Sequence, residues 1–315
     1  MNTHWKWLLF AGGSAIALLA VVAVYGLPGV KGAAPSKPAE FNPHTQHKMA
    51  AMSASLPADM TDPYLDPVSL QMSHMHASES EQTEGEKAVR VQWSWPEGVP
   101  AAGELKKLRL SIADGNGQMI PAFMVTNEKL LHLIAVSSDL RFFQHVHPVY
   151  KGEGIFELPI TFEQGGSYKL YADFMPEGMA ELTRTGSVKV EGAFATPAEL
   201  VSSASMTQHA EGLMVTLHSG ALMAGMQSEL TFSFRDARTG KPVYDMEPYL
   251  GSIGHVVAID EKLEQYLHVH PVNWAATGPI AVFGVMFPKS GLYKIWGQFQ
   301  RGGKPFIVPF VLEVP

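Results

Sequence analysis

The chain has 315 residues, of which 46% are hydrophobic and 17% are charged, and its formal net charge is −7. This length exceeds that of an average domain, so two domains with separate cores are the first expectation. The acidic balance leaves no excess of basic side chains to neutralise phosphates, which excludes nucleic acid as a partner. Cysteine is absent, which excludes disulfide bonds, thiolate metal sites and a cysteine nucleophile, so any metal must be held by histidine, methionine or carboxylate ligands.

The N-terminus carries a membrane signal. Residues 7–30 contain no charged side chain, and at about 1.5 Å per residue their apolar part is long enough to cross a bilayer as a helix. We expect residues 1–30 to form a transmembrane anchor; the alternative is a signal segment that is cleaved near the small residues 32–34. In either case the rest of the protein is expected to be extracytoplasmic, anchored in the cytoplasmic membrane or secreted to the periplasm or cell surface.

Residues 31–87 show no sustained periodicity and are expected to form a flexible, disordered tether. Five methionines and four histidines lie between Asn42 and Ala77. Thioether ligands select soft monovalent ions, above all Cu(I), and imidazole accepts both copper oxidation states. The tether is therefore predicted to capture copper, and the alternative is a linker in which methionine is incidental. The predicted ligands are densest in QMSHMH, which contains Met72, His74, Met75 and His76.

From Ala88 onward the chain consists of short β-prone runs separated by turn sequences. The runs include VRVQWSW, YKLYADF, ELTFSF and YKIWGQF, and the turns include DGNG, EQGG and RTGK. No strong amphipathic helical pattern intervenes, so the strands are expected to connect without helical crossovers. The pattern predicts an all-β protein with two tandem antiparallel immunoglobulin- or cupredoxin-like β-sandwiches. The predicted domains are residues 88–192 and 206–315, joined by a linker at 193–205.

The two halves are copies of one another. The pattern His-x12-His-x-His-Pro begins at His132 and again 123 positions later at His255. A further set of matches follows at an offset of 125 positions, in which Phe162, Gly166, Tyr168, Lys169 and Phe174 correspond to Phe287, Gly291, Tyr293, Lys294 and Phe299. Such an internal duplication predicts two like folds.

Each copy of the histidine pattern is predicted to form a β-hairpin with three histidines on one face. Side chains repeat with a period of two along a strand, so the two histidines of His-x-His share a face. If the first histidine of the pattern pairs opposite the last, it joins that face and three imidazoles converge on one ion. The predicted metal ligands are His132, His145 and His147 in the first repeat and His255, His268 and His270 in the second.

Three imidazoles suit Cu(II), zinc, nickel or iron and leave a position open for a fourth ligand. Asp173 is the candidate for that position in the first repeat and Met246 in the second. The matching positions hold Gln298 and Phe123, so the two sites need not be equivalent, and the second repeat is the expected site if only one hairpin binds metal. The alternative is that the histidines are structural and bond backbone carbonyls or each other at a sandwich edge.

The segments HLIAVSSDLRFFQHVHP and GHVVAIDEKLEQYLHVHP, together with YKLYADFMPEG and YKIWGQFQRGG, resemble the YtkA-like extracytoplasmic β-sandwich domains of secreted and copper-associated proteins. The resemblance covers both predicted β domains but not the tether. It implies a small immunoglobulin- or cupredoxin-like sandwich outside the cytoplasm with a role in metal handling. It supplies no established catalytic residues, so none are assigned.

These features predict an extracytoplasmic metal-binding protein that handles copper as a chaperone, buffer or resistance factor, with zinc as a less favoured ion. The expected partners are the membrane, through the N-terminal helix, and copper-transport or copper-oxidase proteins. The alternative is a non-metal envelope interaction module built from two sandwiches on a membrane stalk. An enzyme ranks last, since no carboxylate has the spacing of a general base and the sequence has neither an HExxH motif nor a nucleophile elbow; a blue-copper site would need a cysteine.

Overall fold

The structure, a computed structural model, describes residues 83–194 and 199–315. All of these residues belong to one compact unit that spans residues 67–315. The predicted membrane anchor and the Met/His part of the predicted tether lie outside the described residues. Within the described ranges, no helix has the length and apolar character needed to span a bilayer.

The only helix of the described residues is short and lies at the end of the predicted tether. It is α1 (Glu84–Ala88), and a capping box between Thr83 and Glu86 begins it. The Glu86 carboxylate accepts the backbone N–H of Thr83 and that of Ala180, each at 2.7 Å. The bond to Ala180 attaches the helix to the first β domain.

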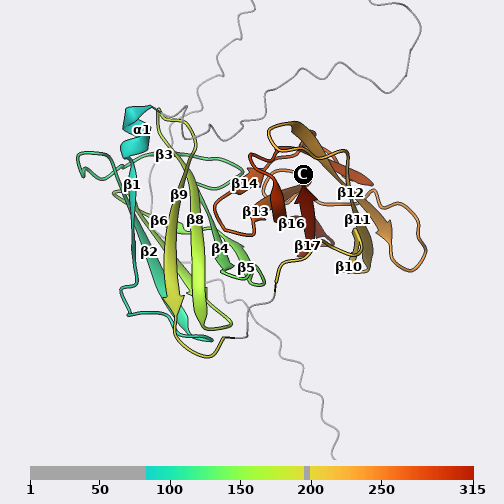
Figure 1. Cartoon of the computed structure of the whole chain (residues 1–315). Helices are drawn as coiled ribbons and strands as arrows, with labels where there is room; N and C mark the ends of the chain where they lie inside the picture. The colour runs from blue at the N-terminus through green and yellow to red at the C-terminus, as the bar shows by residue number, and fades with distance from the viewer. Residues whose placement is uncertain (1–82, 195–198) are drawn as a thin grey trace, which may run out of the picture. The chain divides into compact units, whose positions relative to one another are not determined.

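The first repeat is a sandwich of two antiparallel sheets (Figure 1). One sheet has the strand order β1 (Arg90–Ser94), β2 (Leu105–Ala113), β7 (Ile155–Thr161) and β6 (Val149–Gly152). The other contains β3 (Phe123–Met124), β8 (Gly166–Pro176), β4 (Leu131–Ser137) and β5 (Phe143–Val146), and β9 (Leu182–Val190) also pairs with β8.

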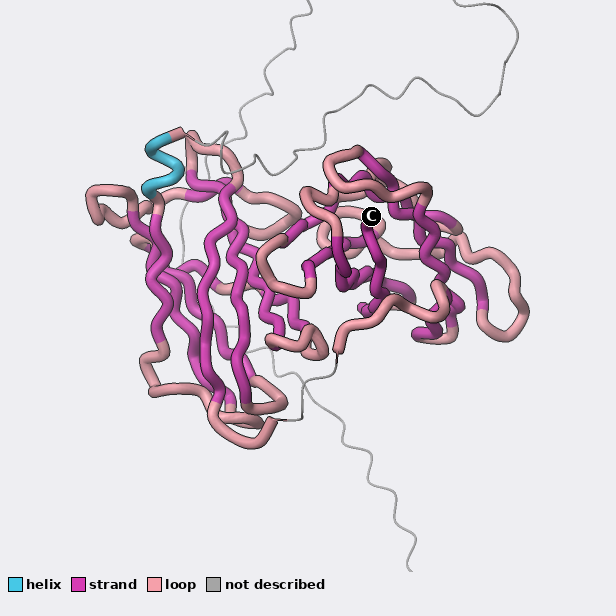
Figure 2. The backbone as a smooth tube through the Cα atoms, viewed as in Figure 1, coloured by secondary structure: helices cyan, strands magenta, loops and turns pink. Residues whose placement is uncertain are grey.

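The second repeat has the same architecture, as the prediction of two tandem sandwiches requires (Figure 2). One sheet has the order β10 (Thr207–Ala210), β11 (Leu213–Ser219), β12 (Gln227–Asp236) and β15 (Ile280–Met286). The other has the order β14 (Tyr266–Val269), β13 (Gly254–Asp260), β16 (Gly291–Arg301) and β17 (Lys304–Val314). The set β9, β8, β4 and β5 of the first repeat therefore corresponds to β17, β16, β13 and β14 of the second.

Each sandwich has its own hydrophobic core, formed by the alternate residues that face inward. Leu108, Leu110 and Ile112 of β2 belong to the first core, and Leu230 and Phe232 of β12 belong to the second. The period-two pattern of the sequence accounts for both cores because successive side chains of a strand point to opposite faces of the sheet. The all-β prediction is confirmed for the part of the chain that the structure describes.

A third core lies between the two repeats and depends on strands that are buried on both faces. Six of the seven residues of β4 are buried, and so are all seven of β13. Leu133 and Ala135 face the first core, whereas Ile134 and Val136 face a separate cluster. This inter-repeat cluster consists of Ile134, Val136, Leu140, Tyr171, Val257, Ile259 and Trp296. One sheet of each repeat therefore buries its outer face against the other repeat.

Aromatic stacking holds this contact together. The rings of Phe143 and Trp296 stack with centroids 4.6 Å apart, and those of Tyr171 and Tyr266 stack at 4.4 Å. The Tyr171 hydroxyl also donates to the Leu263 carbonyl at 3.0 Å.

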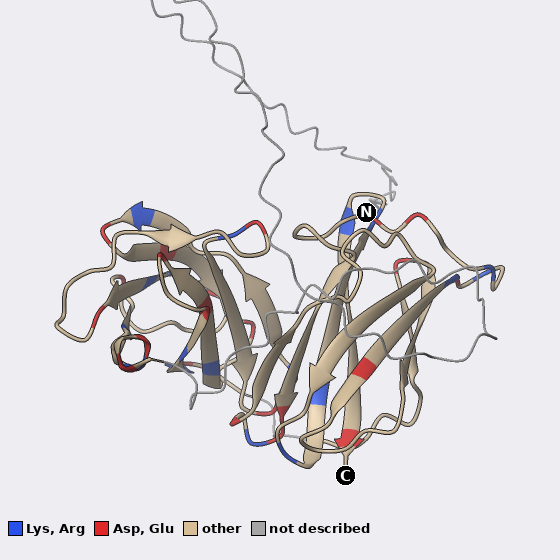
Figure 3. Ribbon diagram, turned by 90° about the horizontal axis from the view of Figure 1, so that it is seen from above, with Lys and Arg blue, Asp and Glu red and all other residues tan. Residues whose placement is uncertain are grey.

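Charged side chains of both signs are spread over the described residues. Figure 3 shows Lys and Arg dispersed among Asp and Glu over strands and loops.

Candidate metal centre

The two histidine hairpins have the register that convergence requires. In the first repeat Leu133 pairs with Val146, which places His132 opposite His147. In the second, Val256 pairs with Val269, which places His255 opposite His270. Because side chains alternate along each strand, these histidines lie on the same face as the inter-repeat cluster. The hairpins therefore direct their imidazoles into the contact between the repeats.

The first triad, His132, His145 and His147, is closely assembled. One ligand nitrogen from each ring lies within 4.8 Å of the others. The shortest separation, 2.9 Å, is between His132 Nδ1 and His145 Nε2. The ring of His147 lies 4.9 Å from each of the other two rings, and its Nε2 is buried without a hydrogen-bond partner among the described residues. A buried polar atom without a partner costs free energy, and a bound ligand would remove that cost.

The second triad, His255, His268 and His270, is less closely assembled. His255 Nδ1 and His268 Nε2 are 3.3 Å apart, but the ring of His270 is 6.4 Å from that of His255. Asn127 of the first repeat donates its side-chain N–H to His270 Nε2 at 2.9 Å. The ring of His270 lies 5.0 Å from that of His268 but does not approach His255. The structure thus favours the first repeat as the better assembled site, contrary to the preference drawn from the sequence.

Met246, the expected fourth ligand of the second repeat, has another environment. It is only 3% exposed and belongs to the hydrophobic core of the second sandwich. Its Cγ lies near the backbone of Gly278 in a neighbouring loop. Packing in this core accounts for the burial of Met246 without a ligand role, and the ligand role stays a prediction. The tether residues Met72, His74, Met75 and His76 lie outside the described residues.

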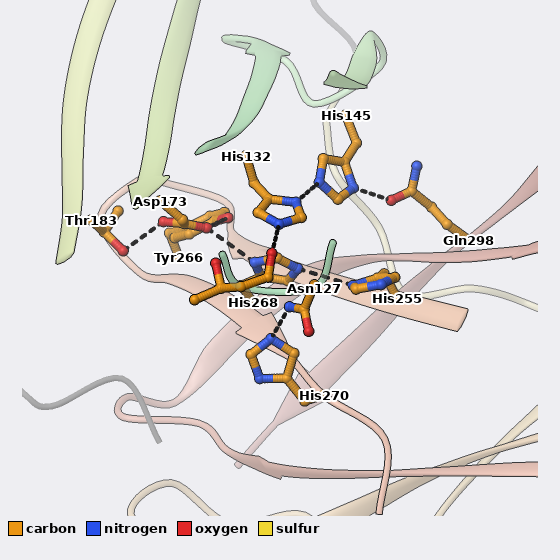
Figure 4. Close-up of polar contacts among 11 residues, drawn as sticks. Asn127, His132, His145, Asp173, Thr183, His255, Tyr266, His268, His270 and Gln298 are labelled. Atoms are coloured by element: carbon orange, nitrogen blue, oxygen red, sulfur yellow. Dashed lines mark hydrogen bonds and ion pairs between the residues drawn. The ribbon is translucent and has the colours of Figure 1, made fainter. Parts of the chain in front are cut away.

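The two triads meet between the repeats. The ring of His132 lies 5.4 Å from that of His268 and 6.2 Å from that of His255, and the ring of His145 lies 5.5 Å and 6.0 Å from the same two rings. All four of these histidines are buried. We call them the histidine centre, and Figure 4 shows them side by side.

In each hairpin, one histidine contacts a residue of the opposite repeat through the ring nitrogen that faces away from its histidine neighbour. We call this nitrogen the outer nitrogen; it is Nδ1 of His145 and Nδ1 of His268. The carboxylate of Asp173, on β8, accepts from His268 Nδ1 at 3.1 Å. At the matching position on β16, Gln298 places its Oε1 2.6 Å from His145 Nδ1. Asp173, expected as the fourth ligand of its own repeat, therefore contacts the triad of the other one (Figure 4). It also accepts from the Thr183 hydroxyl at 2.7 Å and from the Tyr266 hydroxyl.

The direction of the hydrogen bonds limits where protons can lie in each hairpin. His132 Nε2 must donate to the Thr126 carbonyl, 2.9 Å away, and His255 Nε2 must donate to the Leu250 carbonyl at 3.2 Å, because a carbonyl oxygen only accepts. A neutral imidazole has one N–H, so Nδ1 of each of these two rings carries a lone pair. That lone pair points at Nε2 of the next histidine in the hairpin.

His268 lies between two acceptors, Nδ1 of His255 and the carboxylate of Asp173. To bond both neighbours without an ion, it must donate from Nε2 to His255 and from Nδ1 to the Asp173 carboxylate, which requires a positively charged imidazolium. Asp173 favours that charge, but burial and the surrounding imidazoles oppose it and hold the pKa of His268 well below its ordinary value. A neutral His268 cannot make both bonds while Asp173 is a carboxylate.

Burial makes the other imidazoles resist protonation in the same way. It lowers the pKa of His132 and lowers the pKa values of His145 and His255 well below their ordinary value, with nearby histidines adding to the effect for the last two. Burial lowers the pKa of His147 to about 3. Neutral imidazole is the form that coordinates a metal. The site therefore presents several neutral, closely spaced nitrogen ligands near neutral pH.

These lowered pKa values predict acid sensitivity of the metal-free protein. Below about pH 6.5 an unfolded chain protonates its histidines, whereas the folded chain does not until the pH approaches the lower folded values. The unfolded state then binds more protons, so the free energy of unfolding should fall as the pH decreases from 6.5 towards 4. Each such histidine contributes a slope of at most about 1.4 kcal/mol per pH unit.

The measurement is urea denaturation in the presence of a chelator at a series of pH values between 7.5 and 4.5. A His145→Asn variant should show a shallower pH dependence than the wild type. Equal stability of the wild type at pH 7 and pH 5 would show that these imidazoles are not held neutral by the fold.

Sequence reasoning did not identify the cross-repeat contacts of Asn127 and Tyr266, or the contact of Thr183 with Asp173 within the first repeat. One signal was available in LLHLIAV and GHVVAI, which are continuous apolar runs without the polar alternation of a strand that has one wet face. Such runs indicate burial on both faces. They could have shown that each histidine hairpin faces a second buried surface, although not which surface that is.

The fold and the site define the protein as a tandem β-sandwich protein with a buried histidine centre shared by its two repeats. The chain belongs to the family described as Domain of unknown function (DUF8832), which matches residues 86–192 and 208–315. This match confirms the two tandem copies that the duplication predicts. A comparison with curated protein sequences finds no match.

Solved structures with partial similarity are β-rich proteins of several kinds. The Escherichia coli adhesin FdeC is 17% identical with a TM-score of 0.25, over 72% of this chain and 64% of that one. Salmonella alpha-2-macroglobulin is 12% identical with a TM-score of 0.26, over 78% of this chain and 16% of that one. A two-domain fibronectin type III segment of chicken tenascin is 10% identical with a TM-score of 0.22, over 71% and 98%. The chain thus spans less than two thirds of the first two proteins.

Proposed function

We propose that this protein is an extracytoplasmic metal-binding protein that holds copper in its histidine centre. The observation that supports the proposal best is the arrangement of nitrogens in each hairpin. In each hairpin a ring nitrogen of one histidine faces a ring nitrogen of the other. The outer nitrogen of His145 or His268 also faces an oxygen of the opposite repeat. This arrangement is difficult to satisfy with neutral imidazoles alone, and a metal ion between the two inner nitrogens satisfies it.

The distances fit coordination as well as hydrogen bonding. Two nitrogens bound to one ion at about 2.0–2.1 Å, with an angle between 90° and tetrahedral, are about 2.8–3.4 Å apart. The inner nitrogens are 2.9 Å apart in the first hairpin and 3.3 Å apart in the second. Only small side-chain movements are then needed to admit an ion.

Coordination would also give every outer nitrogen a suitable partner. With its Nε2 on an ion, His268 is neutral and carries its proton on Nδ1, from which it donates to the Asp173 carboxylate. His145 would donate to Gln298 Oε1 in the same way, and His132 and His255 already donate to backbone carbonyls. Metal-ligating histidines usually donate their other N–H to a carboxylate or carbonyl, which fixes the ring and raises its basicity.

Copper is the preferred ion on chemical grounds. A site of neutral nitrogens generally binds Cu(II) more tightly than the other divalent first-row ions, including zinc. The Met/His segment between Asn42 and Ala77 would add thioether donors that suit Cu(I), and the resemblance to YtkA-like domains points the same way. The proposed role is a copper chaperone, buffer or resistance factor that exchanges the ion with copper-transport or copper-oxidase proteins outside the cytoplasm.

The test is a competition titration of the full-length, metal-free protein with Cu(II) and a chelator of known affinity. Replacing His145 and His147 with asparagine should weaken the binding assigned to the first triad at least 100-fold, since loss of an outer-shell contact alone costs about 10–100-fold. His209 and His218 are exposed and lie on β10 and β11 of the second repeat. The matched control, His209→Asn with His218→Asn, should bind like the wild type.

Any copper held by the N-terminal segment contributes equally to all three proteins. The proposal fails if the first-triad variant and the control variant retain the same affinity and stoichiometry as the wild type. The histidines would then be structural, and the two sandwiches would be better explained as an interaction module.

A further inference from the structure

Resting on the proposed function, we infer that the histidine centre is one two-ion site, in which an ion held by each repeat lies close enough to the other for the two to interact. The alternatives are one ion shared by both repeats, or two ions that bind independently of each other. The arrangement of lone pairs, the ring separations and the cross-repeat contacts favour two interacting ions.

The lone pairs of the four rings form two converging pairs. Nε2 of His132 and Nε2 of His255 each donate to a backbone carbonyl, so only Nδ1 of each ring has a lone pair that could bind an ion. Nδ1 of His145 and Nδ1 of His268 each bond a residue of the opposite repeat, so Nε2 is the nitrogen of each ring that could bind an ion. Within each hairpin the two available nitrogens are 2.9 Å or 3.3 Å apart. Each hairpin therefore defines its own position for an ion.

The two positions must lie close together because the rings that define them do. Every ring of one hairpin in the histidine centre is between 5.4 Å and 6.2 Å from every ring of the other. These separations hardly exceed the 5.2 Å and 5.5 Å found within the hairpins. All four side chains are buried, so solvent cannot screen the interaction between the ions.

The outer contacts make the two positions depend on each other. Asp173 supports the histidine of the second hairpin from the first repeat, and Gln298 supports the histidine of the first hairpin from the second. Each ion therefore has ligands from one repeat and outer-shell support from the other. The centre exists only while the two repeats are in contact, and each bound ion should stabilise that contact.

The two positions should nevertheless fill in order. In the first triad, one ligand nitrogen of each imidazole already lies within 4.8 Å of the others, and Nε2 of His147 is buried without a hydrogen-bond partner among the described residues. In the second triad the side chain of Asn127 already bonds Nε2 of His270, and the ring of His270 is 6.4 Å from that of His255. Like charges in a buried site also repel each other, so the second ion should bind roughly tenfold or more weakly than the first.

Electron paramagnetic resonance of the full-length protein tests this inference directly. The protein is loaded stepwise with Cu(II), and spectra are recorded at each equivalent. The first equivalent should give an isolated Cu(II) spectrum, and further loading should give dipolar broadening and a half-field transition from two nearby ions. Two variants, His145→Asn with His147→Asn and His268→Asn with His270→Asn, should each lose the half-field signal, whereas the control His209→Asn with His218→Asn should keep it.

The wild-type spectra decide the outcome even if a variant does not fold. Binding that depends on the histidine centre but gives no half-field signal at any loading would overturn the two-ion inference and leave the proposed function intact. Saturation of the centre by a single ion would overturn it as well. Copper binding that is unaffected by either triad variant would instead contradict the proposed function itself.

Discussion

Replacing Asp173 with alanine is expected to lower the free energy of unfolding by about 3–5 kcal/mol, as for the loss of one partner from a buried charged network. Asp173 is fully buried. Its carboxylate accepts from Thr183, Tyr266 and His268, so the substitution removes an acceptor from three donors, of which His268 is buried and the other two are partly buried. Each unsatisfied donor carries a desolvation cost. Chemical denaturation of the chelator-treated protein measures the change.

Two further substitutions separate the role of Asp173 from a general effect of removing a carboxylate. Asp173→Asn keeps the volume and one acceptor oxygen, so it should cost less stability while still weakening the second metal position about 10–100-fold. Asp245 is exposed and paired with Arg301, and Asp245→Ala should change stability little. If Asp173→Ala is no more destabilising than Asp245→Ala, the cross-repeat network does not stabilise the fold.

Replacing Trp296 with alanine is expected to cost about 3–5 kcal/mol, the usual range for removing a buried aromatic side chain. Trp296 is 3% exposed and stacks on Phe143 of the other repeat with centroids 4.6 Å apart. Because its ring packs in the inter-repeat cluster and not in either sandwich core, the loss should fall on the contact between the repeats. We therefore expect the wild type to unfold in one transition and the variant to unfold in two.

The measurement is urea denaturation followed in parallel by tryptophan fluorescence and far-ultraviolet circular dichroism. Tyr244 is 65% exposed, and Tyr244→Ala is the matched control in which both probes should report one unchanged transition. One coincident transition in Trp296→Ala, with little loss of stability, would indicate that the cluster does not couple the repeats. In the copper-loaded variant, the half-field signal should weaken because the two hairpins are no longer held together.

Much of the fold could be predicted because it depends on local or repeated features of the sequence. Period-two alternation indicates strands, turn residues separate them, and the duplication sets the number of domains. The hairpin register that places His132 opposite His147 follows from a short loop between neighbouring strands. The candidate site was predictable in part for the same reason, since all three histidines of each triad come from one hairpin.

The predicted fourth ligands show that residue type and short-range spacing do not determine the tertiary contacts of a side chain. Asp173 is the predicted fourth ligand of its own repeat, and it does pair opposite His132 in the sheet. Its carboxylate nevertheless bonds His268, because the outer face of that sheet is covered by the second repeat. Met246 was chosen for its soft donor atom, yet its side chain packs in a hydrophobic core. Ligand chemistry alone does not say which way a side chain points.

The sequence by itself determined two like sandwiches, two histidine hairpins of the same register and the absence of cysteine ligands, since each of these depends on residue type and short-range spacing. Only the tertiary structure decided that the two hairpins face each other. Contacts between domains depend on which outer faces are complementary, and residues such as His145 and Gln298 are 153 positions apart in the chain. The exchange of outer-shell partners between repeats, with Asp173 on one side and Gln298 on the other, is therefore a property of the folded pair.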